Sequence, residues 1–209
     1  MYTHTCLVSL LFAAILLSVN VFAQDISLPA PKKTGGKPLF DTISERLSTK
    51  EYSDKEIPLQ ELSNILWSAN GFNRTDKRVI PTPMNFQQLS VYVFLKDAIY
   101  LYDAKANKLL KKADGDHRRK IGGQDYVYIA PVNLLYVGDG TKATGVVSAI
   151  PVGCAVQDVY LVCASQGIGC TVRTSGINAG ELRPLLKLTG TDELIAAQTI
   201  GYAAGTPSP

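Results

Sequence analysis

Two patterns of hydrophobic and polar residues recur along the chain and predict its helices and strands. In residues 59–70 the apolar side chains follow the 3.6-residue period of an amphipathic helix. Residues 89–95 and 98–102 are rich in β-branched and aromatic side chains, and the polar pair between them can form a turn. These two segments therefore predict an antiparallel hairpin that follows the helix along the chain.

The other segments complete a mixed pattern of helices and strands. Residues 152–167 are apolar on almost every side, which predicts a buried helix. Asn178, followed three residues later by Glu181, is typical of a helix N-terminus. Further helices are expected at residues 41–47 and 109–120, and further strands at residues 131–137 and 193–202. This order of elements predicts an α+β sandwich with a mainly antiparallel central sheet flanked by helices.

The first residues of the chain indicate export. Residues 6–23 form an apolar stretch that ends in small residues at Ala23, so we expect a signal peptide over residues 1–23 and a secreted or periplasmic protein. The stretch is close to the length of a membrane span, so an uncleaved anchor stays open as the alternative; after cleavage we expect no stable membrane insertion. The remaining segments are a flexible leader at 24–38, rich in Pro, Gly and Lys, one domain at 39–202 and a disordered tail at 203–209.

Charge and cysteine content argue against several classes of function. The net charge is +3, and the basic residues are not gathered into the long stripes that nucleic-acid binding needs, so no nucleic-acid partner is expected. After signal cleavage the chain keeps Cys154, Cys163 and Cys170, an odd number that is not a disulfide framework, although a Cys163–Cys170 pair stays open. With only His4 and His117 in the chain, no metal site is expected.

Arg46, Ser48 and Lys50 form a candidate anion site. In extended backbone, side chains two residues apart share a face, so a guanidinium, a hydroxyl and an ammonium would converge here. Such donors suit a phosphate group. A solvated basic loop is the alternative reading of the same three residues.

Several segments, taken in order along the chain, form a recognisable series. They are Arg46-x-Ser48-x-Lys50, residues 65–74 (ILWSANGFNR), 81–85 (PTPMN), 122–125 (GGQD), 130–134 (APVNL), 157–161 (QDVYL), 164–169 (ASQGIG) and 199–202 (TIGY). This series resembles the nitroreductase-like FMN flavoproteins. The likeness is closest to a small branch that includes exported members and azoline oxidases of the SagB type, and it covers nearly all of residues 39–202.

The resemblance implies a nitroreductase-like fold and a homodimer with two FMN molecules at the subunit interface. In such proteins a hydride passes through the flavin N5, with NAD(P)H as a possible reductant and a small planar, electron-poor acceptor such as a nitroaromatic or a quinone. The chemistry belongs to the flavin, so no side chain is assigned as catalytic. The buried helix expected after residue 152 would pack in the core and against the partner subunit.

The resemblance also implies particular contacts to the cofactor. Backbone N–H groups near Val172, Arg173 and Thr174 would stabilise charge on the reduced ring. The side chains expected at the cofactor are Arg46, Leu47, Ser48 and Lys50 at the phosphate, ribityl chain or ring edge, Gln124 and Arg173 near the ring, and Pro81, Thr82, Pro83 and Asn85 in a loop that reaches the other subunit's flavin.

Two departures from the family pattern affect these expectations. The tail after Tyr202 carries no basic residue, so the phosphate site either is weaker or uses Arg74, Lys77 or Arg78 instead. Thr82 stands where a serine is more usual. Two other functions stay open: a non-catalytic flavin-binding or accessory module, and an export domain without a cofactor.

Overall fold

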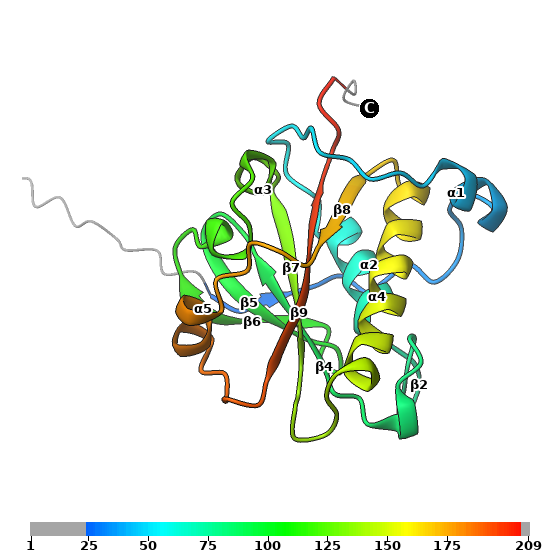
Figure 1. Ribbon diagram of the computed structural model, residues 1–209. Helices are drawn as coiled ribbons and strands as arrows, with labels where there is room; N and C mark the ends of the chain where they lie inside the picture. The colour runs from blue at the N-terminus through cyan, green and yellow to red at the C-terminus, as the bar shows by residue number, and fades with distance from the viewer. Residues whose placement is uncertain (1–23, 206–209) are drawn as a thin grey trace, which may run out of the picture.

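A seven-stranded antiparallel sheet runs through the centre of the protein, with helices on both faces (Figure 1). The computed structural model describes residues 24–205. The strands of this sheet are β1 (Ile26–Ser27), β4 (Leu89–Phe94), β5 (Ala98–Asp103), β6 (Lys108–Asp114), β7 (Val132–Gly138), β8 (Gly169–Arg173) and β9 (Glu193–Gly201). Their spatial order is β1-β6-β5-β4-β7-β9-β8, and every neighbouring pair is antiparallel. The expected α+β class and antiparallel sheet are confirmed.

Helices cover the two faces of the sheet unequally. One face carries α2 (Leu59–Asn70) and the long α4 (Val146–Ser165), while the other carries α3 (Asp125–Ile129) and α5 (Ala179–Leu186) (Figure 1). The outermost helix, α1 (Leu39–Glu45), packs on α4. The remaining elements are a short hairpin of β2 (Phe72–Arg74) and β3 (Lys77–Arg78) and two 3-10 turns, η1 (Pro83–Asn85) and η2 (Arg118–Ile121).

The strand β7 lies at the centre of the sheet because its sequence is apolar on both sides. All seven of its residues are buried, so the two helical layers meet it from opposite faces. Leu134 belongs to the core under α2 and α4, and Leu135 belongs to the core under α3 and α5. The alternation of side chains along one strand thus divides the interior into two apolar layers.

The helix α4 begins six residues before the predicted start and contains Pro151. A proline inside a helix has no N–H for the carbonyl four residues earlier, here that of Val147. The side chain of Gln88 supplies the missing donor, because its Nε2 lies 3.1 Å from the Val147 carbonyl oxygen. A loop residue therefore makes the longer helix possible.

Among residues 24–205, α4 is also the one helix that meets the length and hydropathy of a membrane span. Here it packs against α2 and the sheet.

The expected helix at residues 109–120 is wrong, since this stretch forms β6 followed by η2. Its Lys, Leu and Ala residues favour a helix locally, but the segment pairs with β5 on one side and with β1 on the other, with Leu109 opposite Tyr102. Leu109 is fully buried by this pairing. Tertiary pairing has overridden local propensity.

The description of residues 24–38 as a flexible leader is also corrected. Ile26 and Ser27 pair with β6 as an edge strand, and Leu28 is buried. The amide of Lys32 donates to the Asn64 side chain at 2.8 Å, which ties the segment to α2. The segment therefore pairs with β6, which would otherwise be the edge strand of the sheet.

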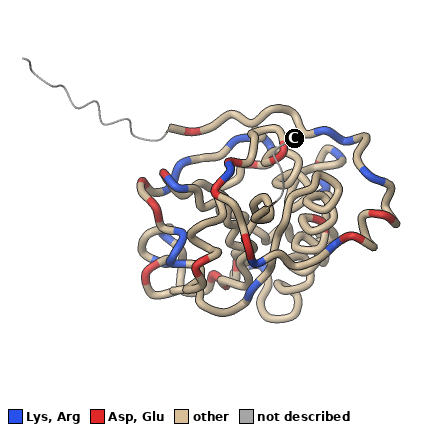
Figure 2. Tube along the Cα trace, turned by 90° about the horizontal axis from the view of Figure 1, so that it is seen from above, with Lys and Arg blue, Asp and Glu red and all other residues tan. Residues whose placement is uncertain are grey.

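The ends of the chain fall partly outside the description. The predicted signal peptide at 1–23 and residues 206–209 of the predicted tail lie outside the described residues. Ala203 to Gly205 are described, and the Ala204 amide donates to the Glu51 carbonyl at 3.0 Å, so this part of the expected disordered tail is bound to the domain. Charged residues are interspersed around the described surface (Figure 2). Cys163 and Cys170 are free and buried.

Candidate functional site

Arg46, Ser48 and Lys50 lie on an extended segment that follows α1. The backbone turns out of the helix at Arg46, with φ −58° and ψ 123°. Ser48 forms a parallel bridge with Cys170 of β8, and the Thr49 amide donates to the Cys170 carbonyl at 3.0 Å. Alternation then buries Thr49 and exposes Ser48 and Lys50, as expected for extended backbone.

Two of the three predicted donors meet at Tyr160 of α4. The Arg46 guanidinium carbon lies 5.1 Å from the centre of the Tyr160 ring, and the Ser48 Oγ lies 2.9 Å from the Tyr160 hydroxyl. The same hydroxyl accepts a hydrogen bond from the Val172 amide at 2.9 Å. Lys50 is exposed without a side-chain partner in the described chain. Tyr160 therefore joins the extended segment to β8.

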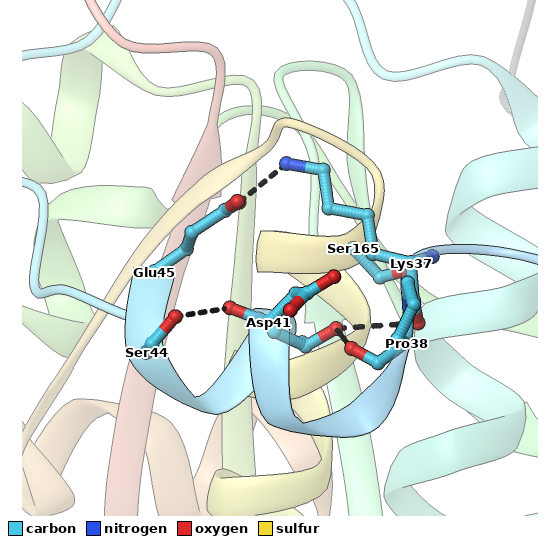
Figure 3. A network of polar contacts seen from close by, with 7 residues as sticks. Lys37, Pro38, Asp41, Ser44, Glu45 and Ser165 are labelled. Atoms are coloured by element: carbon cyan, nitrogen blue, oxygen red, sulfur yellow. Dashed lines mark hydrogen bonds and ion pairs between the residues drawn. The ribbon is translucent and has the colours of Figure 1, made fainter.

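The position of Arg46 depends on how α1 docks. Figure 3 shows the polar contacts around this helix and Ser165 at the end of α4. Lys37 donates its amide to the Ser165 Oγ at 2.9 Å, and its ammonium pairs with Glu45 at the last turn of α1. Thr42 bonds back to the Pro38 carbonyl at 3.0 Å. Both ends of α1 are thus fixed directly before the candidate anion site.

The backbone beyond β8 presents N–H groups close to this site. The amides of Thr174, Ser175 and Gly176 donate no hydrogen bond within the described residues. Gly176 has φ +80°, and a Cβ there would lie 3.3 Å from Gly122 Cα, so the two loops touch. Gln124 follows in the second loop at the start of α3, where it is exposed. Hydrogen bonds thus join Ser48, Tyr160 and Val172, and Gly176 touches Gly122, two residues before Gln124. We call these residues, together with Arg46, Lys50 and the amides of residues 174–176, the Tyr160 surface.

Arg173 does not point to this surface, and its assignment as a cofactor side chain is corrected. Its Nε donates to the Ile121 carbonyl at 3.1 Å, and its terminal nitrogens donate to Thr199 and, at 3.4 Å, to Asn133. The side chain is 7% exposed, and burial lowers the pKa of the guanidinium. Alternate residues of β8 face opposite sides of the sheet, so Val172 faces outward while Arg173 faces inward and bonds to Ile121 in the segment before α3.

The loop of residues 81–85 lies elsewhere in the chain. Met84 and Asn85 have positive φ angles of 49° and 58°, a conformation that is uncommon outside glycine and asparagine. Pro81, Thr82 and Asn85 line a cavity of about 260 Å³ together with Arg74, Lys77 and Arg78, and Pro83 begins η1.

This loop is anchored at the opposite end of α4 from Arg46 and Ser48. Gln88, three residues after this loop, bonds to Val147 near the start of α4, whereas Ser48 bonds to Tyr160. Thirteen residues of helix separate these positions, which corresponds to about 20 Å. One chain therefore does not bring the two groups of predicted residues together.

The proposed basic substitutes for a C-terminal lysine or arginine do not reach Arg46 within one chain either. Arg78 is engaged elsewhere, with donors to the Asn70 carbonyl at 2.7 Å and to Gln87 at 3.1 Å. Arg74 and Lys77 lie at the 260 Å³ cavity. Within residues 24–205 there is also no group of three or more His, Cys, Asp or Glu side chains placed to hold a metal ion.

Sequence reasoning missed Tyr160 and Asn133 as organising residues. Tyr160 lies in an almost wholly apolar helix, where a buried phenol needs a hydrogen-bond partner, and this signal marks it. Asn133 lies in the fully buried strand β7, and its Oδ1 accepts from Thr199 at 2.6 Å. A buried amide in an apolar strand carries the same signal.

The fold and the Tyr160 surface together define a class of protein: an α+β domain that presents cationic and hydroxyl donors beside free backbone amides. The model of the nitroreductase family matches residues 43–202, so the chain belongs to the nitroreductase family of oxidoreductases.

Individual relatives agree with this assignment. A protein from Methanocaldococcus jannaschii, provisionally named a nitroreductase, is 28% identical over 170 residues, which cover 72% of this chain and 84% of the relative. A crystal structure of a protein from Ralstonia eutropha JMP134, also provisionally named a nitroreductase, is 35% identical, with a TM-score of 0.81 over 90% of this chain and 93% of that chain. A Desulfovibrio desulfuricans structure in complex with FMN shares the fold, with 22% identity and a TM-score of 0.61 over 84% of this chain and 92% of that one.

The donor set of the Tyr160 surface fits a flavin mononucleotide. A phosphate needs charged and hydroxyl donors, which Arg46, Lys50 and Ser48 supply. The polar edge of an isoalloxazine ring needs N–H donors, which the free amides of residues 174–176 supply. Gly123 and Gly176 carry no side chain that would block a flat ring. A Cβ added at Gly123 would have no neighbour within 4 Å, and one added at Gly176 would approach only the backbone of Gly122 and Gly123, at 3.3 Å or more.

Proposed function

We propose that this chain is an exported FMN-dependent oxidoreductase of the branch that resembles SagB-type dehydrogenases. The single observation that carries the proposal is the Tyr160 surface, in which one hydroxyl joins Ser48 of the phosphate-type donor set to Val172, two residues before the free backbone amides of residues 174–176. Bound FMN would supply hydride transfer through its N5. The predicted signal segment at residues 1–23 supports export.

Each part of the surface has a separate task. Arg46 and Lys50 neutralise the phosphate or the ring edge, and Ser48 adds a short neutral donor held in place by Tyr160. The predicted stretch of amides was residues 172–174, but the Val172 amide already bonds to Tyr160, so the free amides of residues 174–176 would take this role. They would stabilise the developing charge of the reduced ring in a fixed arrangement that needs no reorganisation during the reaction. Leu47, which is 63% exposed, provides apolar cover beside these donors.

A second copy of the chain completes the proposed site. Leu39, Phe40 and Ile43 of α1 and Val146 and Ile150 of α4 are exposed, with Phe40 at 83% and Val146 at 76%. Apolar side chains on neighbouring helices favour burial against a partner. A homodimer would cover them and would bring residues 81–85 of one copy to the Arg46 segment of the other, about 20 Å away along α4 within one chain.

The proposed substrate is a small planar, electron-poor acceptor such as a nitroaromatic or a quinone. NAD(P)H is the reductant that we propose to test first. The alternative is a flavin-binding module that retains the cofactor without turnover. Flavin reduction by NADH, NADPH or a quinol separates the two, because the module would hold FMN that none of these donors reduces.

The deciding experiment measures FMN affinity in the mature chain and in Arg46→Ala. A charge-assisted hydrogen bond contributes about 1.5 to 3 kcal/mol, so the variant should bind FMN ~10 to 100-fold more weakly. Lys96→Ala, an exposed substitution in the β4–β5 turn, is the matched control and should bind as the parent chain does. A refolded parent chain that binds no FMN at micromolar concentration would falsify the proposal.

A further inference from the structure

A second ligand-sized cavity lies away from the Tyr160 surface. Its volume is about 490 Å³, within the range of small-molecule sites, and it lies between the segment after β1, the end of α2, the β2 hairpin and the β5–β6 turn. The ordered N-terminal segment forms one wall, because the Leu28 amide donates to the Asn107 carbonyl at 3.1 Å. None of its lining residues belongs to the Tyr160 surface.

Aromatic rings from three elements line this cavity: Trp67, Phe72 and Tyr102. Their polar atoms are already occupied, since Trp67 Nε1 donates to the Phe72 carbonyl at 3.1 Å and the Tyr102 hydroxyl donates to Asn107 at 3.2 Å. Burial raises the pKa of Tyr102 to about 12, so the phenol is neutral at physiological pH. The three rings therefore offer a ligand apolar surface rather than hydrogen bonds.

The charged residues that line the cavity are all basic. Lys33, Arg74 and Lys105 come from three different segments, and no Asp or Glu lines the cavity. None of the three forms an ion pair within the described residues. Arg74 donates one hydrogen bond, from its Nε to the neighbouring Asn73 side chain at 3.2 Å, which leaves its two terminal NH₂ groups as donors. A ring-lined cavity thus carries three cations without an ion pair, of which Lys33 lies 5.8 Å from the centre of the Trp67 ring.

We propose that this cavity binds a small aromatic carboxylate, with its ring against Trp67 and Phe72 and its carboxylate at Arg74. Planar guanidinium donors match a carboxylate in a two-pronged geometry. Isolated surface lysines are ordinarily only solvated, but here the cations converge over one aromatic cavity. The inference does not rest on FMN binding, because no residue that lines the cavity belongs to the Tyr160 surface.

The probe is 4-iodobenzoate, and the reporter is Trp67, which is the only tryptophan of the sequence. Iodine quenches indole fluorescence at short range, so a ligand in this cavity gives saturable quenching in the purified full chain. The matched neutral ligand is 4-iodobenzyl alcohol, which lacks the charge but keeps the ring and the iodine. We expect the alcohol and the Arg74→Ala variant each to raise the apparent Kd at least ~10-fold.

Controls separate this cavity from other binding modes. Arg46→Ala and Lys96→Ala should leave the affinity for 4-iodobenzoate unchanged, whereas the triple variant of Lys33, Arg74 and Lys105 to alanine should abolish saturable quenching. All three side chains are exposed, so the triple variant should fold, which circular dichroism checks. The proposal is overturned by linear quenching that is equal for acid and alcohol, or by saturable quenching that is lost in Arg46→Ala and kept in Arg74→Ala.

Discussion

Replacing Tyr160 by phenylalanine tests whether one hydroxyl organises the candidate site. The ring is 5% exposed and stays in place, so the change removes only the oxygen that bonds to Ser48 and to the Val172 amide, each at 2.9 Å. A hydrogen bond contributes about 0.5 to 1.5 kcal/mol net. Water can reach both former partners, because Ser48 is exposed and Val172 is 37% exposed. We therefore expect the free energy of unfolding to fall by about 1 to 2 kcal/mol.

The same variant should weaken FMN binding. Once its partner is gone, the Ser48 side chain and the backbone at Val172 are held less firmly, and a loss of about 1 kcal/mol corresponds to ~5-fold in affinity. Urea unfolding measures the first quantity and flavin titration measures the second. Tyr126→Phe is the matched control, because the Tyr126 hydroxyl makes no hydrogen bond within the described residues and its ring, which packs against Tyr52 and the core under α3 and α5, is kept.

A double-mutant cycle with Ser48→Ala separates positioning from general stability. If Tyr160 acts on the flavin through Ser48, the two substitutions together should weaken FMN binding by less than the sum of their separate effects. Additive effects, or a Tyr160→Phe variant that is destabilised but binds FMN as the parent chain does, would refute the positioning role.

Two further predictions concern the scaffold. A Cβ at Gly140 would lie 1.8 Å from the Thr191 carbonyl oxygen, so Gly140→Ala should lower the free energy of unfolding by about 1 to 3 kcal/mol. Gly190 has open space around it, so Gly190→Ala should change the free energy of unfolding little. Thermal unfolding compares the two variants. Burial alone would raise the pKa of Asp116, but hydrogen bonds from Arg118 outweigh it and leave this pKa below its ordinary value. A carboxyl group whose pKa is lower in the folded than in the unfolded state stabilises the fold at pH values above its unfolded-state pKa. This stabilisation is lost as the pH falls through its folded-state pKa. Asp116→Asn should therefore lower the free energy of unfolding by about 1 kcal/mol at pH 7, a figure reduced for partial solvent screening, and by progressively less below pH ~4. Urea unfolding measures this loss, and an equal loss at pH 7 and pH 3 would contradict this account.

The sequence predicted those elements whose signal is local. The amphipathic period of residues 59–70 and the paired β-rich runs after it became α2 and the β4–β5 hairpin. Asn178 accepts a hydrogen bond from the Glu181 amide, as its spacing indicated. These predictions are confirmed because each depends on residues only a few positions apart in the sequence.

Signals that depend on distant partners were misread. Residues 108–114 have helix-forming side chains but pair as a strand, and residues 26–27 look like a linker but close the sheet edge beside them. The predicted helix began at residue 152, whereas α4 begins at Val146 and contains Pro151, and Gln88, far earlier in the chain, supplies the donor that the proline lacks. In each case the deciding partner is non-local, and sequence spacing does not show it.

The sequence by itself determined the α+β class, the order of most elements and the presence of Arg46, Ser48 and Lys50 on an extended segment, because these follow from local periodicity and alternation. Only the tertiary structure decided that Tyr160 joins this segment to β8, that Arg173 turns inward to Asn133, and that residues 81–85 are anchored at the other end of α4. The physical reason is that a side chain's role depends on which buried polar groups it must satisfy, and the fold chooses those partners.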